Sequence, residues 1–147
     1  MRKSLYLTLG MLMLASMLQP ARAQDKAGGT LKVKVTYTGS GKVDDDHPIF
    51  VFLFDSPAFA QGPAMPFASQ RATSKKETVT FSGVSKSPAY VAIVYDPTGA
   101  YEGMSPPPSG ASLGMYSKTP GQPAAVEIQE GKTTEVEVTF DDSQKMP

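Results

Sequence analysis

The sequence contains no cysteine and only one histidine, His47. Without thiols the chain can form no disulfide and no thiol-based redox site, and it has no cysteine for a lipid anchor. A single imidazole also excludes active sites that need several histidines as metal ligands or acid–base groups. After residue 23 no stretch approaches the roughly 20 apolar residues that span a bilayer. These absences predict a soluble product without common active-site chemistry.

The first 23 residues have the pattern of a secretory signal peptide. Arg2 and Lys3 precede an apolar run from Leu5 to Leu18, and Ala21-Arg22-Ala23 follows. A positive start, a short apolar stretch and a small-x-small end predict cleavage after Ala23 and a periplasmic or secreted protein. We therefore expect a signal peptide at 1–23, a single domain at 24–142 and a short C-terminal tail at 143–147.

Removal of the signal peptide changes the charge balance of the chain. Of fourteen basic residues, Arg2, Lys3 and Arg22 are lost, so eleven remain against fourteen acidic residues and the net charge becomes −3. No cluster of lysine or arginine forms a basic stripe, which disfavours nucleic acid as a partner.

Apolar and polar residues alternate through most of the remaining chain, which predicts half-buried strands. Leu31 to Tyr37 and Thr133 to Phe140 show the period of two. No segment has a sustained 3.6-residue apolar period, so we expect six to eight short strands and almost no helix. His47–Phe54 and Tyr90–Tyr95 are apolar on both faces, which predicts two central strands, in neighbouring or separate positions, whose second face is covered by a loop of the same chain or by a partner.

Two long irregular segments, 56–69 and 104–123, are rich in proline and carry spaced apolar residues. Loops of this length in a compact domain are usually functional or disordered, and the apolar residues favour docking. We predict that Phe67 and one of Met104, Leu113 or Met115 cover the outer phenylalanine face of 49–54.

The segment from Thr78 to Asp96, TVTFSGVSKSPAYVAIVYD, resembles the strand–glycine–turn–tyrosine–strand–aspartate core of transthyretin-like sandwiches. These include the carboxypeptidase regulatory-like domains and related bacterial exported families, and the resemblance covers roughly residues 29 to 142. It implies an all-β, seven-stranded antiparallel Greek-key sandwich of the transthyretin-like or immunoglobulin-like kind. The histidine-dependent enzymes of this fold are disfavoured because His47 stands alone. Pro97, Thr98 and Gly99 occupy the place of a calcium-type loop, which disfavours calcium there.

Three groups of residues are candidate sites. Aromatic and acidic residues at the end of the predicted strand 90–95 and in the loops beyond it form the predicted binding site for a small ligand. Aromatic rings beside carboxylates suit sugars or cationic ligands. The alternative is that the tyrosines only cap the core.

Asp44 to His47 offers ligands for a hard cation, or is an acidic turn before a strand. Methionines 65, 104, 115 and 146 suit copper(I), or fill gaps in packing. The predicted ligand-binding residues are Tyr95, Asp96, Tyr101, Glu102 and Tyr116.

From these observations we expect a non-enzymatic exported binding or accessory module with no cofactor. Its partner would be a protein or glycan of the cell envelope, and its working surface the loops between Asp96 and Pro123. A carbohydrate-interacting domain and a periplasmic metal-binding protein are the alternative functions.

Overall fold

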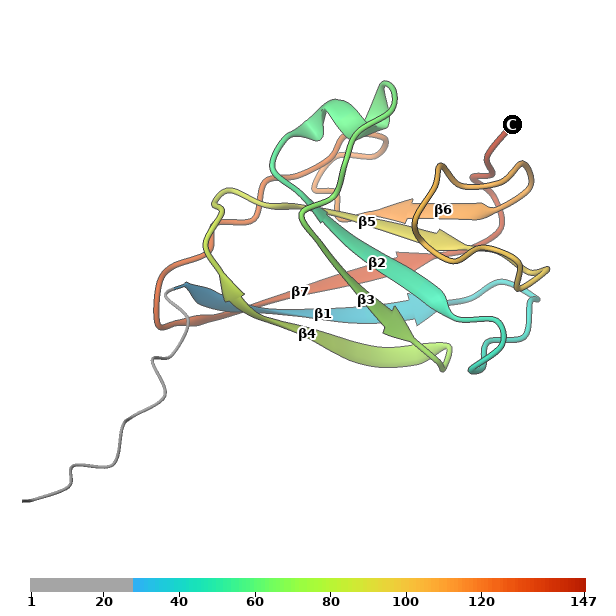
Figure 1. Ribbon diagram of the computed structural model, residues 1–147, viewed down its shortest axis with the longest axis horizontal. Helices are drawn as coiled ribbons and strands as arrows, with labels where there is room; N and C mark the ends of the chain where they lie inside the picture. Colours follow the sequence, from blue (N-terminus) through green and yellow to red (C-terminus); the bar gives the residue numbers. More distant parts are fainter. Residues whose placement is uncertain (1–27) are drawn as a thin grey trace, which may run out of the picture.

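The structure, a computed structural model, describes residues 28–147, and the predicted signal peptide lies outside the described residues. Within them the protein is an all-β sandwich of two stacked sheets (Figure 1). The only helical element there is a short 3-10 turn, η1 (Pro57–Ala60), and no helix is long and apolar enough to cross a membrane. One sheet has the order β4 (Lys76–Val84), β1 (Gly29–Tyr37), β7 (Thr133–Phe140), and the other has the order β3 (Ala68–Ala72), β2 (Ile49–Phe54), β5 (Tyr90–Tyr95), β6 (Ser112–Met115).

The predicted all-antiparallel arrangement is wrong for one pair of strands. β1 runs antiparallel to β4, with Val33 opposite Val79, but it runs parallel to β7, with Val33 opposite Val136. Antiparallel neighbours can be joined by a tight hairpin, whereas a parallel pair needs a long crossover connection. Along the sequence, all four strands of the other sheet lie between β1 and β7, so no hairpin constrains the relative direction of these two strands. Alternation of side chains predicts each strand but not which way it runs.

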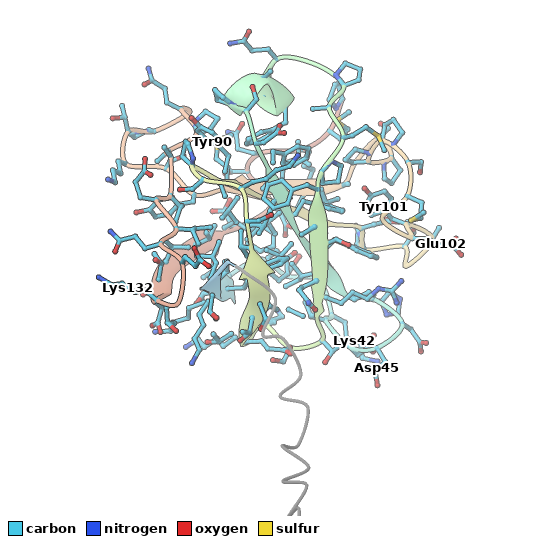
Figure 2. The ribbon with its side chains drawn as sticks, turned by 60° about the vertical axis from the view of Figure 1, so that its left-hand side comes forward. Lys42, Asp45, Tyr90, Tyr101, Glu102 and Lys132 are labelled. Carbon is cyan, nitrogen blue, oxygen red and sulfur yellow. The ribbon has the colours of Figure 1, made fainter. Side chains whose placement is uncertain are left out.

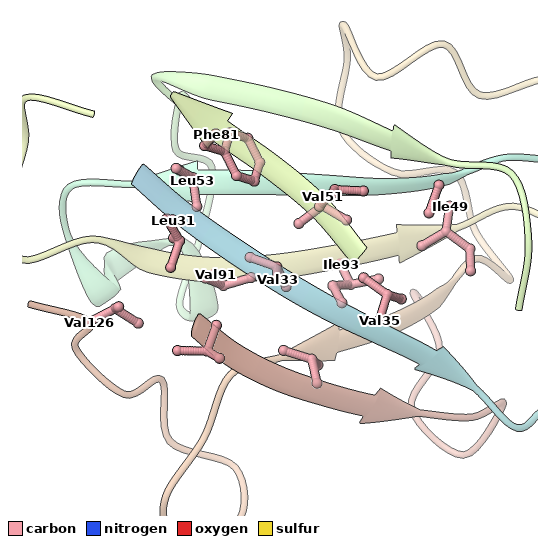
Figure 3. Packing of buried hydrophobic residues seen from close by; sticks show 14 of the residues in the cluster. Leu31, Val33, Val35, Ile49, Val51, Leu53, Phe81, Val91, Ile93 and Val126 are labelled. Atoms are coloured by element: carbon pink, nitrogen blue, oxygen red, sulfur yellow. The ribbon is translucent and has the colours of Figure 1, made fainter. Parts of the chain in front are cut away.

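The core lies between the sheets and consists of the inward side chains of the alternating strands. Leu31, Val33 and Val35 of β1 face Ile49, Val51 and Leu53 of β2, all fully buried (Figure 3). Burying each of these side chains stabilises the fold by about 1.5–3 kcal/mol. The prediction of two central strands is confirmed, because β2 and β5 pair with each other and both lie between other strands of their sheet.

The outer face of the four-stranded sheet is covered by loops, as expected from its three phenylalanines. Phe50, Phe52 and Phe54 form a second buried cluster, and Leu113 packs against it. The prediction for Leu113 is therefore confirmed. The other covering side chains come from three different segments of the chain: Phe59, Tyr101, Ala111 and Met146.

The prediction that Phe67 covers this face is wrong. Its ring packs instead on the edge of the main core, with the Lys86 ammonium 5.2 Å from the ring centroid. The Phe67 amide donates to the Leu53 carbonyl just before β3 begins, at a point where the strand alternation does not yet hold. Because Phe67 lies outside β3, the alternation of side chains along the strand does not determine which face its ring packs on.

The C-terminal segment is part of the domain rather than a separate tail. The Leu113 amide donates to the Gln144 carbonyl, and the Met146 amide donates to the Ala111 carbonyl, each at 2.8 Å. These bonds place residues 144–146 along the outer side of β6 and bring Met146 onto the phenylalanine cluster. The expected boundary at residue 142 therefore cuts off a segment that covers an edge of the sheet.

Candidate functional site

Asp96, one of the five predicted ligand-binding residues, organises the loop that follows β5. Only 4% of its surface is exposed. Its carboxylate accepts hydrogen bonds from the Thr98 amide at 2.9 Å and from the Tyr101 amide at 3.0 Å. Burial raises the pKa of Asp96, but the hydrogen bonds from Thr98 and Tyr101 outweigh it and hold the pKa below its ordinary value. Both carboxylate oxygens are used to fold this loop.

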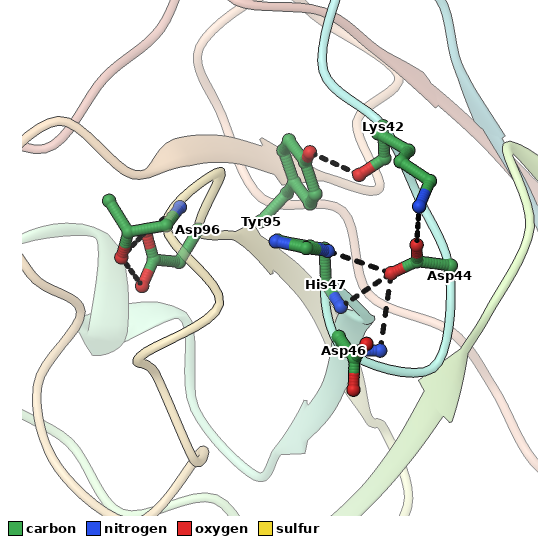
Figure 4. A network of polar contacts seen from close by, with 7 residues as sticks. Lys42, Asp44, Asp46, His47, Tyr95 and Asp96 are labelled. Carbon is green, nitrogen blue, oxygen red and sulfur yellow. Dashed lines mark hydrogen bonds and ion pairs between the residues drawn. The ribbon is translucent and has the colours of Figure 1, made fainter.

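The predicted tyrosines are held inside the protein. Tyr95 is 1% exposed and points into the sandwich, where its hydroxyl donates to the Lys42 carbonyl at 2.6 Å (Figure 4). Tyr101 is also buried, and its hydroxyl donates to the Ser105 carbonyl at 2.9 Å. Tyr116 is half-buried against the main core. These side chains cap the core, and the buried Tyr95 and Tyr101 rings offer no open face for a ligand to stack on.

Glu102 is the one predicted ligand-binding residue that reaches the surface. It is exposed and lies beside Tyr101 on one side of the molecule (Figure 2). Tyr95, the last residue of β5, packs in the main core, whereas Asp96 lies just after the strand and bonds to the loop whose Tyr101 packs on the outer cluster. The five residues therefore do not form one site.

The acidic segment before β2 folds as a turn. One oxygen of Asp44 accepts from the His47 amide at 2.9 Å and lies 2.8 Å from His47 Nδ1, while the other is paired with the Lys42 ammonium (Figure 4). The hydrogen bonds from Lys42 and then His47 hold the pKa of Asp44 well below its usual range. Within residues 28–147 no three histidine, cysteine or acidic side chains are grouped to hold a metal ion. The donors already around Asp44 favour the acidic-turn interpretation.

A cleft of about 400 Å³ opens on the outer face of the four-stranded sheet, between β3 and the loop after β5. Ser69, Gln70 and Arg71 of β3 form one wall. The loop forms the other wall, and a phenylalanine of β2 contributes to the lining. The remaining lining residues are Phe50, Glu102, Gly103 and Met104.

The pairing of β2 with β3 positions the charged wall of the cleft. Arg71 lies directly opposite Phe50, so both side chains belong to the outer face. The guanidinium carbon of Arg71 is 5.0 Å from the centroid of the Phe50 ring, in the geometry of a cation–π contact. Tyr101 meets the same ring edge-on at a centroid distance of 5.0 Å. Phe50 is thus held from two sides and supports Arg71.

Gly103 allows the loop to lie directly on this ring. Its φ is +80°, and a Cβ built there would be 2.8 Å from two carbons of Phe50. Any other residue would combine an unfavourable backbone conformation with a steric clash. Next to it, Met104 is 90% exposed and forms an apolar rim.

The two charged groups of the cleft have no ionic partners among the residues that the structure describes. Neither Arg71 nor Glu102 forms a salt bridge there, unlike Lys34, Lys42 and Lys86. A guanidinium presents five donors in a fixed planar fork that matches a carboxylate or phosphate. The cleft therefore offers an unpaired cation, an unpaired anion and an apolar rim to a ligand.

The sequence interpretation missed Arg71 and Gly103. The segment Ala68–Ala72 has no apolar alternation that would identify it as a strand, so nothing placed Arg71 beside Phe50. The one signal for Gly103 was its position directly after Tyr101 and Glu102, two of the predicted ligand-binding residues.

Comparison with known proteins found no matching family model, no similar curated protein and no similar solved structure.

Proposed function

We propose that this protein is a non-enzymatic binding module that the cell exports, and that the cleft is its binding site. The observation that carries the proposal is Arg71, which has no salt bridge within residues 28–147, is supported on Phe50 and shares the cleft with the exposed Met104. An arginine next to an exposed apolar side chain is typical of the residues that contribute most to protein–protein binding. The partner is a protein of the cell envelope.

Export is supported by the N-terminal sequence pattern, which predicts cleavage after Ala23 and a periplasmic or secreted location. The test is fractionation of cells that express the full chain, followed by N-terminal sequencing. A mature protein that begins at Gln24 in the periplasm or medium is expected. An uncleaved chain retained in the cytoplasm contradicts export.

The non-enzymatic part of the proposal is supported by the contacts of the single histidine. His47 bonds to Asp44, which could orient it as a base, but no hydroxyl among residues 28–147 forms a hydrogen bond with its imidazole. A catalytic serine or threonine is commonly activated by such a contact with an adjacent base.

The two alternative functions have less support from the geometry. Sugar binding by stacking needs open aromatic faces, and Tyr95 and Tyr101 are buried. Metal binding at Asp44 would have to displace the contacts from Lys42 and His47.

We also propose the finer architecture that the resemblance implies, a seven-stranded Greek-key sandwich of the transthyretin-like kind. It is supported by the crossing of the chain between sheets after β1, β3, β4 and β6. A crystal structure tests it through the strand order.

Site-specific photo-cross-linking tests the binding site. A benzoylphenylalanine at Met104 is expected to form an adduct with an envelope protein in cells that express the full chain. The matched control is the same substitution at Thr80, an exposed residue on β4 in the other sheet. No adduct at either position, or equal adducts at both, contradicts the assignment of the cleft.

A further inference from the structure

The two edges of the four-stranded sheet differ in how they are covered. The outer side of β6 pairs with the chain's own residues 144–146. In the part of the chain that the structure describes, β3 pairs with β2 alone, and no other segment bonds to its outer side. β3 also lacks the lysine and proline residues that commonly protect an edge strand from pairing. The sheet therefore has one covered edge and one open edge.

The cleft borders β3, the open edge strand of the sheet. Ser69 and Arg71 lie opposite Phe52 and Phe50 and share the outer face, whereas Gln70 lies opposite Val51 and belongs to the other face. The cleft is lined by all three consecutive residues and therefore borders this part of β3. A chain that pairs with the free backbone groups of β3 would lie on the side of β3 away from β2, and its outward side chains would share the outer face with Ser69 and Arg71.

The charges of the cleft specify the composition of such a chain. Arg71 is held on the Phe50 ring and has no carboxylate partner within residues 28–147, so it is preorganised for one. Glu102 disfavours a run of acids in the same cleft. The exposed Met104 side chain is available to an apolar residue two positions from the acid, which shares its face in a strand.

We propose that the ligand of the cleft is an extended peptide segment that adds to β3 as a further strand and places a single carboxylate on Arg71. This inference rests on the proposed function, because it names the ligand class of the same site. Backbone hydrogen bonds to β3 supply affinity, and the acid and its apolar neighbour supply specificity.

A library of random octapeptides displayed on phage tests the inference with protein purified from the full chain. We expect selected peptides to carry one aspartate or glutamate with an apolar residue two positions away. Their binding should weaken at least roughly tenfold in Arg71→Gln, the loss expected for a charge-assisted pair. The matched control is Lys132→Gln, an exposed cation far along the chain in the turn before β7, which should bind as the parent does.

Synthetic copies of a selected peptide separate the remaining possibilities. Amidated and free C-termini distinguish a side-chain carboxylate from a terminal one. N-methylation at alternate residues should abolish binding in one register only, because alternate amides face β3. Selection without enrichment of acids, affinity unchanged in Arg71→Gln, or indifference to N-methylation overturns the inference. Cross-linking at Met104 together with any of these results leaves the cleft as a binding site and refutes only the ligand class.

Discussion

A hydrogen bond between a tyrosine and an aspartate joins the end of β1 to the segment that follows β7. The Tyr37 hydroxyl donates to Asp142 at 2.6 Å and accepts from the Gly41 amide at 3.2 Å. The Ser112 hydroxyl donates to the same carboxylate oxygen at 2.7 Å. The hydrogen bonds from Tyr37 and Ser112 lower the pKa of Asp142 to about 2. Burial and the bond to Asp142 raise the pKa of Tyr37 to about 12, so the phenol stays protonated and able to donate.

The magnitude of the interaction follows from this pKa. The change from the ordinary value of 3.8 to about 2 corresponds to roughly 2.4 kcal/mol at 1.36 kcal/mol per pH unit. Asp142 is partly exposed, so solvent screening reduces this to about 1–2 kcal/mol for all its donors together. Because the folded pKa is the lower one, the stabilisation is present above about pH 4 and is lost as the pH falls towards 2.

We predict that Tyr37→Phe lowers the free energy of unfolding by about 1–2 kcal/mol at pH 7, close to the lower range for a hydrogen bond to a charged group. The penalty should shrink by more than half at pH 2.5, where Asp142 begins to take up a proton. Urea unfolding followed by far-ultraviolet circular dichroism at the two pH values measures both quantities.

Tyr95→Phe is the matched control, because the Tyr95 hydroxyl donates to the uncharged carbonyl of Lys42. Its penalty should be about 0.5–1.5 kcal/mol and should change little between the two pH values. A Tyr37→Phe penalty below about 0.3 kcal/mol at pH 7, or the same pH dependence in both variants, would refute the reasoning about Asp142.

Two further predictions concern the cleft and its loop. Gly103→Ala should destabilise the protein by about 2–3 kcal/mol in urea unfolding, because it combines a φ of +80° with a clash against Phe50. Gly121→Ala, with a φ of +77° and no atom within 4 Å of the new Cβ, should lose only about 1 kcal/mol, and equal losses would exclude the clash. Hydrogen peroxide should convert the exposed Met104 to its sulfoxide several-fold faster than the half-buried Met146, as measured by peptide mass spectrometry. Equal rates would contradict the exposure of this rim.

Much of the fold could be predicted because a period of two directly encodes which face of a strand is buried. Leu31 to Tyr37 and Thr133 to Phe140 alternate and form β1 and β7 within a residue or two of the expected bounds. The doubly apolar β2 and β5 identified the centre of a sheet. β3 was not predicted because its side chains are small or polar and its position depends on pairing with β2.

The candidate site could be predicted less well, because it depends on contacts between distant segments. Tyr101 is buried because its loop folds back onto Phe50 and Phe52, which the order of residues does not reveal. Alternation placed Tyr95 in the main core, but it gives no direction for Asp96, which lies just after β5. Arg71 enters the site only through the register of β2 and β3.

A sheet that is apolar on both faces needs two layers of cover, and here loops rather than helices supply the outer one. Tyr101 extends from its loop over Phe50 and Phe52, and the Arg71 guanidinium lies over the remaining side of Phe50 towards the edge. Arginine can cover an aromatic ring while keeping its charge in water, which a leucine in the same place could not do. Arg71 therefore both covers part of the apolar face and presents a charge that has no ionic partner within residues 28–147, so the proposed binding site lies where the loop layer meets the open strand.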